Sequence, residues 1–181
     1  MIRLLDYTAL PATRWKNGAG ETREIISVPA REAGFLWRAS IATVSQDGPF
    51  SPFMGIDRVI TLLEGEPFQL VSDSTSHLLQ LHQPWSFAGE TPIEARQVRS
   101  AGLDFNVMTL RGQAQSSVCT ASVQQSLQHE GVAWVLKGRW QTPVGEIAPR
   151  GGVVWDNTAT GMLTPLTANA LLLWATIVRH N

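Results

Sequence analysis

Short apolar segments that alternate with turn residues dominate this chain and restrict what it can fold into. Strand-like segments occupy residues 36–44, 57–64, 68–71 and 103–110, with Gly and Pro between them. The same rhythm continues in residues 117–123, 132–141, 153–155 and 171–178, and no long amphipathic helix interrupts it. Short strands at this spacing are typical of a sandwich or a barrel. The sequence therefore predicts an all-β fold.

The chain is also expected to consist of two halves. A polar stretch at residues 111–117, rich in Gln and Ser, is the best candidate boundary. We therefore predict a first domain at residues 1–112, which holds the ligand pocket, and a second, smaller domain at residues 113–181. Within the second half, residues 132–141 are predicted to form a β-hairpin that turns at Lys137-Gly138.

Composition excludes several classes of function. The chain has 181 residues, 44% hydrophobic and 16% charged, with a net charge of −1. Without a basic block there is no footprint for nucleic acid, and no apolar run is long enough to cross a bilayer. Residues 1–10 lack the pattern of a signal peptide. Cys119 is the single cysteine, so we expect no internal disulfide, a buried strand position for this residue, and a cytoplasmic location.

A metal site is not expected either. The four histidines are His77, His82, His129 and His180; none forms an H-x-H pair, and residues 48–65 contain no His. Metal sites need several convergent imidazole or carboxylate ligands. Nucleophile elbows and Gly-rich phosphate loops are absent as well. The expected cofactor content is none.

Strand alternation gathers polar groups on particular faces. It places Arg38 with Ser40 and Ala42, and it places Asp104 with Asn106 and Met108. Arg58 shares one face of the predicted strand at residues 57–64 with Ile60 and Leu62. A buried guanidinium needs a partner, so Arg38 and Arg58 either pair internally with Glu21, Glu24 or Asp104, or they bind the carboxylate of a ligand. Both alternatives remain open at the level of the sequence.

The segment at residues 15–24 has two readings. It contains Trp15, Asn17 and Glu21 together with two glycines and further charges. It is either an Asn-Gly turn followed by a solvated charge cluster, or a recognition loop on a rigid scaffold.

Several motifs together resemble the HutD/Ves family of the cupin superfamily. They are WKNGAGETREI at residues 15–25, FLWRASIA at 35–42, GPFSPF at 48–53, DR at 57–58, TLLEG at 61–65, DFNVM at 104–108 and GGVV at 151–154. The resemblance covers almost the whole chain. It implies two cupin-type (double-stranded β-helix, or jelly-roll) barrels in tandem and an association with histidine utilisation or with stress and cold response.

Together, the residues and the resemblance predict a metal-free protein that binds a small carboxylate metabolite. The resemblance points to an intermediate of histidine breakdown, such as urocanate or a formylated glutamate derivative. Two arginines, an amide and an aromatic wall suit such a ligand. The expected binding residues are Asn17, Glu21, Arg38, Arg58, Asp104 and Asn106.

Two rival functions belong to other classes. In the first, an isomerase or hydrolase would use Glu21, Glu24 or Asp104 as a general base beside an arginine. In the second, the chain is purely an interaction protein, and the interface between its two halves is the functional surface. The second half lacks comparable polar clusters and is expected to serve packing or dimerisation, so a homodimer is an expected assembly.

Overall fold

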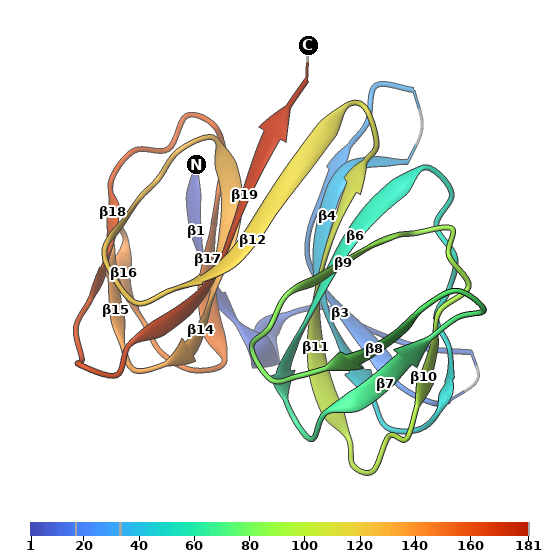
Figure 1. Ribbon diagram of the computed structural model, residues 1–181. Coiled ribbons are helices and arrows are strands. Elements are labelled where there is room, and N and C mark those ends of the chain that lie inside the picture. Colours follow the sequence, from blue (N-terminus) through green and yellow to red (C-terminus); the bar gives the residue numbers. More distant parts are fainter. Residues whose placement is uncertain (17, 33, 181) are drawn as a thin grey trace. The chain divides into compact units, whose positions relative to one another are not determined.

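Strands make up almost all regular structure in the computed structural model, which describes residues 1–16, 18–32 and 34–180. The exception within these ranges is one 3-10 helix, η1 (Tyr7–Ala9). The chain divides into two units (Figure 1). The N-terminal unit contains Pro11–Gln115, and the C-terminal unit combines Met1–Leu10 with the residues from Ser116 onward. The predicted all-β fold is confirmed.

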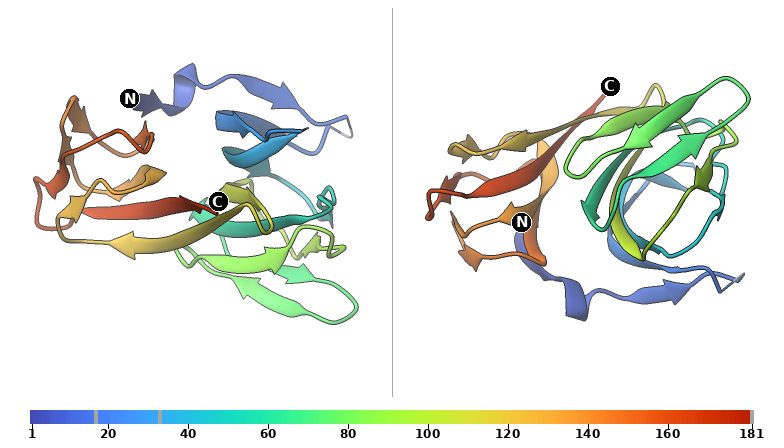
Figure 2. Two further views of the ribbon diagram at one scale, coloured as in Figure 1. Left: turned by 90° about the horizontal axis from the view of Figure 1, so that it is seen from above. Right: turned by 60° about the horizontal axis from the view of Figure 1, so that its bottom comes forward.

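The N-terminal unit is built from two sheets that lie as two layers (Figure 2). The larger sheet has six antiparallel strands in the order β2-β3-β4-β11-β6-β9. These are β2 (Ala12–Arg14), β3 (Glu21–Pro29), β4 (Phe35–Val44), β11 (Gly102–Leu110), β6 (Ile56–Glu64) and β9 (Trp85–Ala88). The smaller sheet has the order β5-β10-β7-β8. Its strands are β5 (Gly48–Pro49), β10 (Glu94–Arg96), β7 (Phe68–Val71) and β8 (Ser76–Leu79).

An apolar core joins these two sheets. Ile60 and Leu62 of β6 pack with Leu70 of β7 and Leu79 of β8, and none of the four side chains has exposed surface. Arg58 precedes Ile60 by two residues, so it shares their face of β6. One strand face is therefore polar at one end and apolar at the other.

The C-terminal unit repeats this plan. A five-stranded sheet has the order β1-β17-β14-β19-β12, and a four-stranded sheet has the order β13-β18-β15-β16. The strands are β1 (Ile2–Asp6), β17 (Gly151–Trp155), β14 (Glu130–Lys137), β19 (Leu171–Arg179), β12 (Ala114–Ala121), β13 (Gln125–Ser126), β18 (Met162–Pro165), β15 (Trp140–Thr142) and β16 (Gly145–Ile147). Trp155 and Trp174 stack in its core with ring centroids 4.7 Å apart. Within the described residues, none of the four sheets closes on itself.

The first ten residues do not join the unit that the sequence predicted for them. β1 pairs with β17 along its whole length, from Ile2 opposite Trp155 to Asp6 opposite Gly151. The blue strand β1 accordingly lies beside β17 in Figure 1. This pairing covers an edge of β17 that would otherwise expose unpaired backbone groups. A pairing between positions so distant in the chain leaves no local signal in the sequence.

The predicted hairpin at residues 132–141 is wrong. β14 pairs with β17 and β19, whereas β15 pairs with β16 and β18, so the segment passes from one sheet to the other. Gly138 has a φ of +70°, and a Cβ at this position would lie 2.2 Å from Oγ1 of Thr167. Gly138 thus allows the chain to pass closely by Thr167 where it crosses from one sheet to the other.

Cys119 was expected to be buried, but it is exposed. It lies on the edge strand β12, whose single neighbouring strand is β19. No helix in the part of the chain that the structure describes has the length and hydrophobicity that a bilayer crossing requires.

Candidate functional site

Three neighbouring strands of the N-terminal unit place polar side chains in rows. Residues directly opposite each other in antiparallel strands point to the same face of a sheet. Met108 of β11 lies opposite Arg38 of β4 on one side and Arg58 of β6 on the other. In the next rows, Asn106 lies between Ser40 and Ile60, and Asp104 lies between Ala42 and Leu62.

A cavity of about 520 Å³ opens over these rows. The sheet contributes Arg38, Ser40 and Ala42 from β4, Arg58 from β6, Asp104, Asn106 and Met108 from β11, and Thr13, Arg14 and Thr22 from β2 and β3. Pro49 of β5 and five loop residues complete the wall, namely Trp15, Lys16, Phe50, Ser51 and Phe53. The cavity is therefore part aromatic and part cationic.

Arg58 is the most enclosed cation of this cavity, with 5% of its surface exposed. Its guanidinium donates to Oδ1 of Asn106 at 2.8 Å and to the main-chain oxygen of Ser51 at 3.2 Å, while Nε has no partner. The rings of Phe50, Phe53 and Phe87 lie 5.7, 5.3 and 4.8 Å from its central carbon. Burial lowers the pKa of Arg58 to about 10, although the charge of Asp104 acts in the opposite direction.

Asn106 connects Arg58 to Asp104. Its side-chain NH₂ group donates to Oδ1 of Asp104, while its own oxygen accepts from Arg58. Asp104 is 1% exposed, and its Oδ2 has no hydrogen-bond partner. Burial raises the pKa of Asp104 to about 7, against the lowering influence of Arg58 and of the Asn106 bond. The Asp104 carboxyl group is thus about half protonated at neutral pH, where an ordinary aspartate is ionised.

Arg38 is held differently. Its Nε donates to Oε2 of Glu24 at 2.9 Å, and the two side chains are 22% and 45% exposed. Glu24 lies opposite Ser40 in the strand register, which brings it to the same face. The two arginines thus differ in which of the two alternatives, an internal ion pair or a ligand carboxylate, applies to them. Arg38 has an internal carboxylate, whereas Arg58 forms no ion pair among the described residues.

Trp15, Lys16 and Thr22 form one wall of the cavity. The indole N–H of Trp15 donates to Oγ1 of Thr22 at 2.8 Å, and its main-chain N–H donates to the oxygen of Gly20 at 2.9 Å. A Cβ on Gly20 would lie 2.1 Å from the main-chain oxygen of Thr43 and 3.2 Å from the Trp15 ring. Gly20 therefore allows the close approach that positions Trp15.

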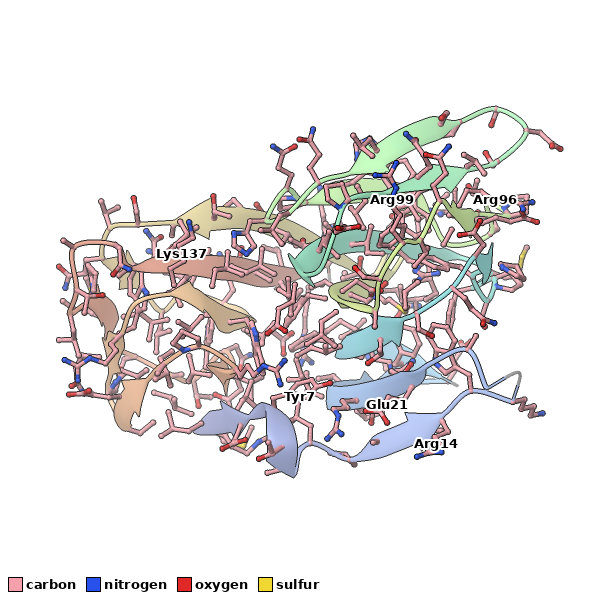
Figure 3. All side chains as sticks on the ribbon, turned by 90° about the horizontal axis from the view of Figure 1, so that it is seen from below. Tyr7, Arg14, Glu21, Arg96, Arg99 and Lys137 are labelled. Atoms are coloured by element: carbon pink, nitrogen blue, oxygen red, sulfur yellow. The ribbon has the colours of Figure 1, made fainter. Side chains whose placement is uncertain are left out.

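The structure brings together four of the six sequence-predicted residues: Arg38, Arg58, Asp104 and Asn106. Glu21 does not line the cavity. Its neighbour Thr22 does, so strand alternation turns Glu21 to the other face, where it pairs with Arg23 at 2.9 Å. Figure 3 shows Glu21 on β3, next to the strand that carries Arg14. Asn17 lies outside the described residues.

Other cavity residues were missed as site candidates. Ser40 and Thr22 were not included, although Ser40 had been placed on the face of Arg38 by alternation alone. The same period on β3 would have indicated Thr22 instead of Glu21, had the start of that strand been known.

Within residues 1–16, 18–32 and 34–180, no three His, Cys, Asp or Glu side chains gather in a way that could hold a metal ion. His77 instead stacks on Trp85, with ring centroids 4.6 Å apart and planes 5° from parallel.

The comparisons with known proteins agree on one group of relatives. The model of the HutD family matches residues 7–171. Protein Ves of Cronobacter sakazakii is 38% identical over 159 residues, which cover 86% of this chain and 87% of that protein. Protein Ves of Citrobacter koseri is also 38% identical, over 86% of this chain and 84% of its own.

Solved structures show the same likeness in three dimensions. HutD from Pseudomonas fluorescens SBW25 superposes over the whole of both chains with a TM-score of 0.87 and 22% identity. A cupin 2 conserved barrel domain protein from Leptotrichia buccalis superposes with a TM-score of 0.65 and 8% identity, over 97% of this chain and 96% of its own. At these identities the likeness shows the fold, which is cupin-like.

Proposed function

The chain belongs to the HutD family, and we propose that its N-terminal unit binds a small carboxylate metabolite and thereby moderates a catabolic pathway. The family resemblance directs this proposal toward histidine utilisation or a related stress response. In the proposal, the two units are two cupin-type barrels in tandem, and only the N-terminal one carries the ligand. The exposed free thiol of Cys119 suits a reducing cytoplasm.

One observation carries the proposal: Arg58 is a buried cation that forms no ion pair among the described residues. It faces a cavity of about 520 Å³, its Nε is unpartnered, and its nearest polar acceptors are an amide and a main-chain oxygen. An unpaired buried charge is strongly unfavourable. A ligand carboxylate would satisfy the remaining N–H groups in the planar geometry that guanidinium prefers.

The surrounding charges support an anionic ligand. Arg14, Lys16, Arg38 and Arg58 line the cavity, and Asp104 is the one acidic residue among the described residues that line it. Because burial favours the neutral form of Asp104, the cavity is positive at neutral pH. The rings of Phe50, Phe53 and Trp15 offer an apolar wall for the rest of the ligand.

Isothermal titration calorimetry with urocanate and with N-formylglutamate tests the proposal. Formate is included as the smallest carboxylate, since the Pseudomonas fluorescens HutD structure was determined in a formate condition. We expect binding to the wild-type protein and its loss in Arg58→Met. Arg96→Met is the matched control, because Arg96 is an exposed arginine of β10 paired with Glu94 outside the cavity (Figure 3). Failure of all three carboxylates to bind would contradict the proposal.

A second candidate function, a small-molecule isomerase or hydrolase, rests on Asp104. A carboxyl group with a pKa of about 7 is suited to general acid–base catalysis, and Arg58 would stabilise developing negative charge. Glu21 is directed away from the cavity and Glu24 is paired with Arg38, which leaves Asp104 as the candidate base. Conversion of a bound carboxylate, followed by NMR and abolished in Asp104→Asn, would favour this function over simple binding.

A further inference from the structure

Asp104 occupies a position in the cavity that its neighbours do not explain. The residue is 1% exposed and lines the cavity, yet Oδ2 has neither a donor nor an acceptor in contact. Buried polar atoms in native proteins are nearly always hydrogen-bonded. An orphaned carboxyl oxygen on a residue that lines a cavity therefore points to a group that arrives from outside.

The orientation of Asn106 indicates which oxygen carries a proton. Arg58 can only donate, so the Asn106 atom that it contacts is the amide oxygen. The NH₂ group of Asn106 must then face Asp104, where it donates to Oδ1. Oδ1 is thereby an acceptor, which leaves Oδ2 as the oxygen that can carry a proton and donate it to a hydrogen bond.

We propose that Asp104 recognises the ligand as a protonated acid, donating from Oδ2 to the ligand's carboxylate, so that the N-terminal unit takes up a proton when an anion binds. This inference rests on the proposed function, because the ligand is the carboxylate held by Arg58. Arg58 supplies charge, and Asp104 supplies a hydrogen bond that only its neutral form can make. Asp104 is then a specificity residue that makes affinity depend on pH.

The charged groups around Asp104 come from several strands. β6 contributes Arg58, and β4 contributes Arg38, which is paired with Glu24 of β3. Arg14 and Lys16 line the cavity from β2 and the residues after it. The cations favour the ionised form of Asp104 and burial opposes them, with burial the larger influence. A bound anion also favours the neutral form of Asp104, because its negative charge opposes ionisation of the carboxyl group.

The sign of the pH dependence follows from this balance. Below the pKa of Asp104 in the empty cavity, the acid is already protonated and affinity is maximal. Above that pKa, a proton must be acquired on binding, so affinity falls by up to about tenfold per pH unit. The fall ends at the higher pKa that Asp104 has beside the bound anion. If Oδ2 were instead ionised and accepted an N–H group of the ligand, the affinity would change in the opposite direction.

Calorimetry with N-formylglutamate, which has no group that titrates near neutral pH, measures this linkage. Titrations between pH 6 and 9 in buffers of different ionisation enthalpy give the number of protons exchanged. We expect proton uptake by the wild-type protein and by Asp73→Asn, which alters an exposed turn aspartate. In Asp104→Asn the new amide still donates to the anion, so we expect binding with no proton exchange and a flat pH profile.

A second measurement keeps the inference open to refutation if N-formylglutamate does not bind. Carboxyl ¹³C NMR of the ligand-free protein, with Asp104→Asn used for assignment, follows the titration of Asp104 directly. Titration in the ordinary range of an aspartate would overturn the inference whatever the ligand. Binding accompanied by proton release, or by no exchange, would also overturn it while leaving the proposed function intact. Absence of binding together with a neutral-range titration would remove the proposed function and, with it, this inference.

Discussion

Nη2 of Arg58 lies 2.8 Å from Oδ1 of Asn106, and through this bond the guanidinium fixes which end of the Asn106 amide faces Asp104. Three buried polar residues thus form one chain on a sheet whose other inward residues are largely apolar. The energetics of the cavity depend on the middle member of this chain.

We therefore expect Asn106→Ala to destabilise the protein by about 2–5 kcal/mol, since it leaves a guanidinium N–H and a carboxyl oxygen buried without partners. Ser40→Ala is the matched control, because Ser40 lies directly opposite Asn106 and is 3% exposed. The free energy of unfolding in urea measures both variants. Equal stability of the two would mean that Arg58 and Asp104 re-pair without Asn106.

For the ion pair of Arg38 and Glu24 we expect a small effect on stability and a larger effect on ligand affinity. Both side chains are partly exposed, so Glu24→Gln should change the unfolding free energy by less than about 1 kcal/mol. The same change removes a carboxylate that competes for Arg38, and the affinity for N-formylglutamate should rise several-fold. Arg38→Met should lower that affinity with little effect on stability.

A matched control for this pair is Glu146→Gln, which breaks the exposed pair with Arg139 in the C-terminal unit and should leave affinity unchanged. A drop in affinity in Glu24→Gln would contradict the competition and assign to Glu24 the orientation of Arg38.

How far the sequence predicts this site depends on strand period. Alternation along β4 and β11 was sufficient to place Arg38 with Ser40 and Asp104 with Asn106, because both strands run without a break through their polar residues. Strand alternation does not tell whether such a face borders a cavity or packs on another sheet, since the tertiary structure decides this.

The misses have equally specific causes. Glu21 begins a strand, and an error of one residue in the start of a strand reverses the face of every side chain. The pairing of β1 with β17 joins positions about 150 residues apart, for which local patterns carry no information. Lys137-Gly138 has turn chemistry, but the turn leads to a different sheet from the one a hairpin would require.

The position of Trp15 in the cavity wall leads to a prediction about packing. Gly20→Ala should cost about 1–3 kcal/mol, because its Cβ would meet the main-chain oxygen of Thr43 at 2.1 Å and neither backbone can yield easily. The shift should also move Trp15 and weaken N-formylglutamate binding. Gly48→Ala is the control, since nothing lies within 4 Å of a Cβ there and its φ is not positive. Similar urea midpoints for the two variants would show that the backbone around Gly20 can shift without loss of stability.

The last prediction concerns stability and pH in the absence of ligand. The pKa of Asp104 is raised from an ordinary value of 3.8 to about 7 by burial. Between these values the unfolded chain is ionised at this residue while the folded protein keeps the proton. Its contribution to stability is therefore complete below about pH 4 and is lost as the pH rises toward 7, by up to about 1.4 kcal/mol per pH unit. Above pH 7 no further loss is expected.

Other groups with shifted pKa values also make stability depend on pH, within or below this range, so the comparison must be made between variants. Burial lowers the pKa of His77 below its ordinary value of 6.5. The free energy of unfolding therefore gains a contribution from His77 as the pH rises toward 6.5. Glu90 and Asp156 have pKa values of about 2, and the stability they contribute is lost only in more acidic solution. The difference in unfolding free energy between Asp104→Asn and the wild-type protein cancels all three. That difference should favour the variant increasingly from pH 4 to 7 and then level off, whereas a constant difference would show that Asp104 is ionised in the folded protein.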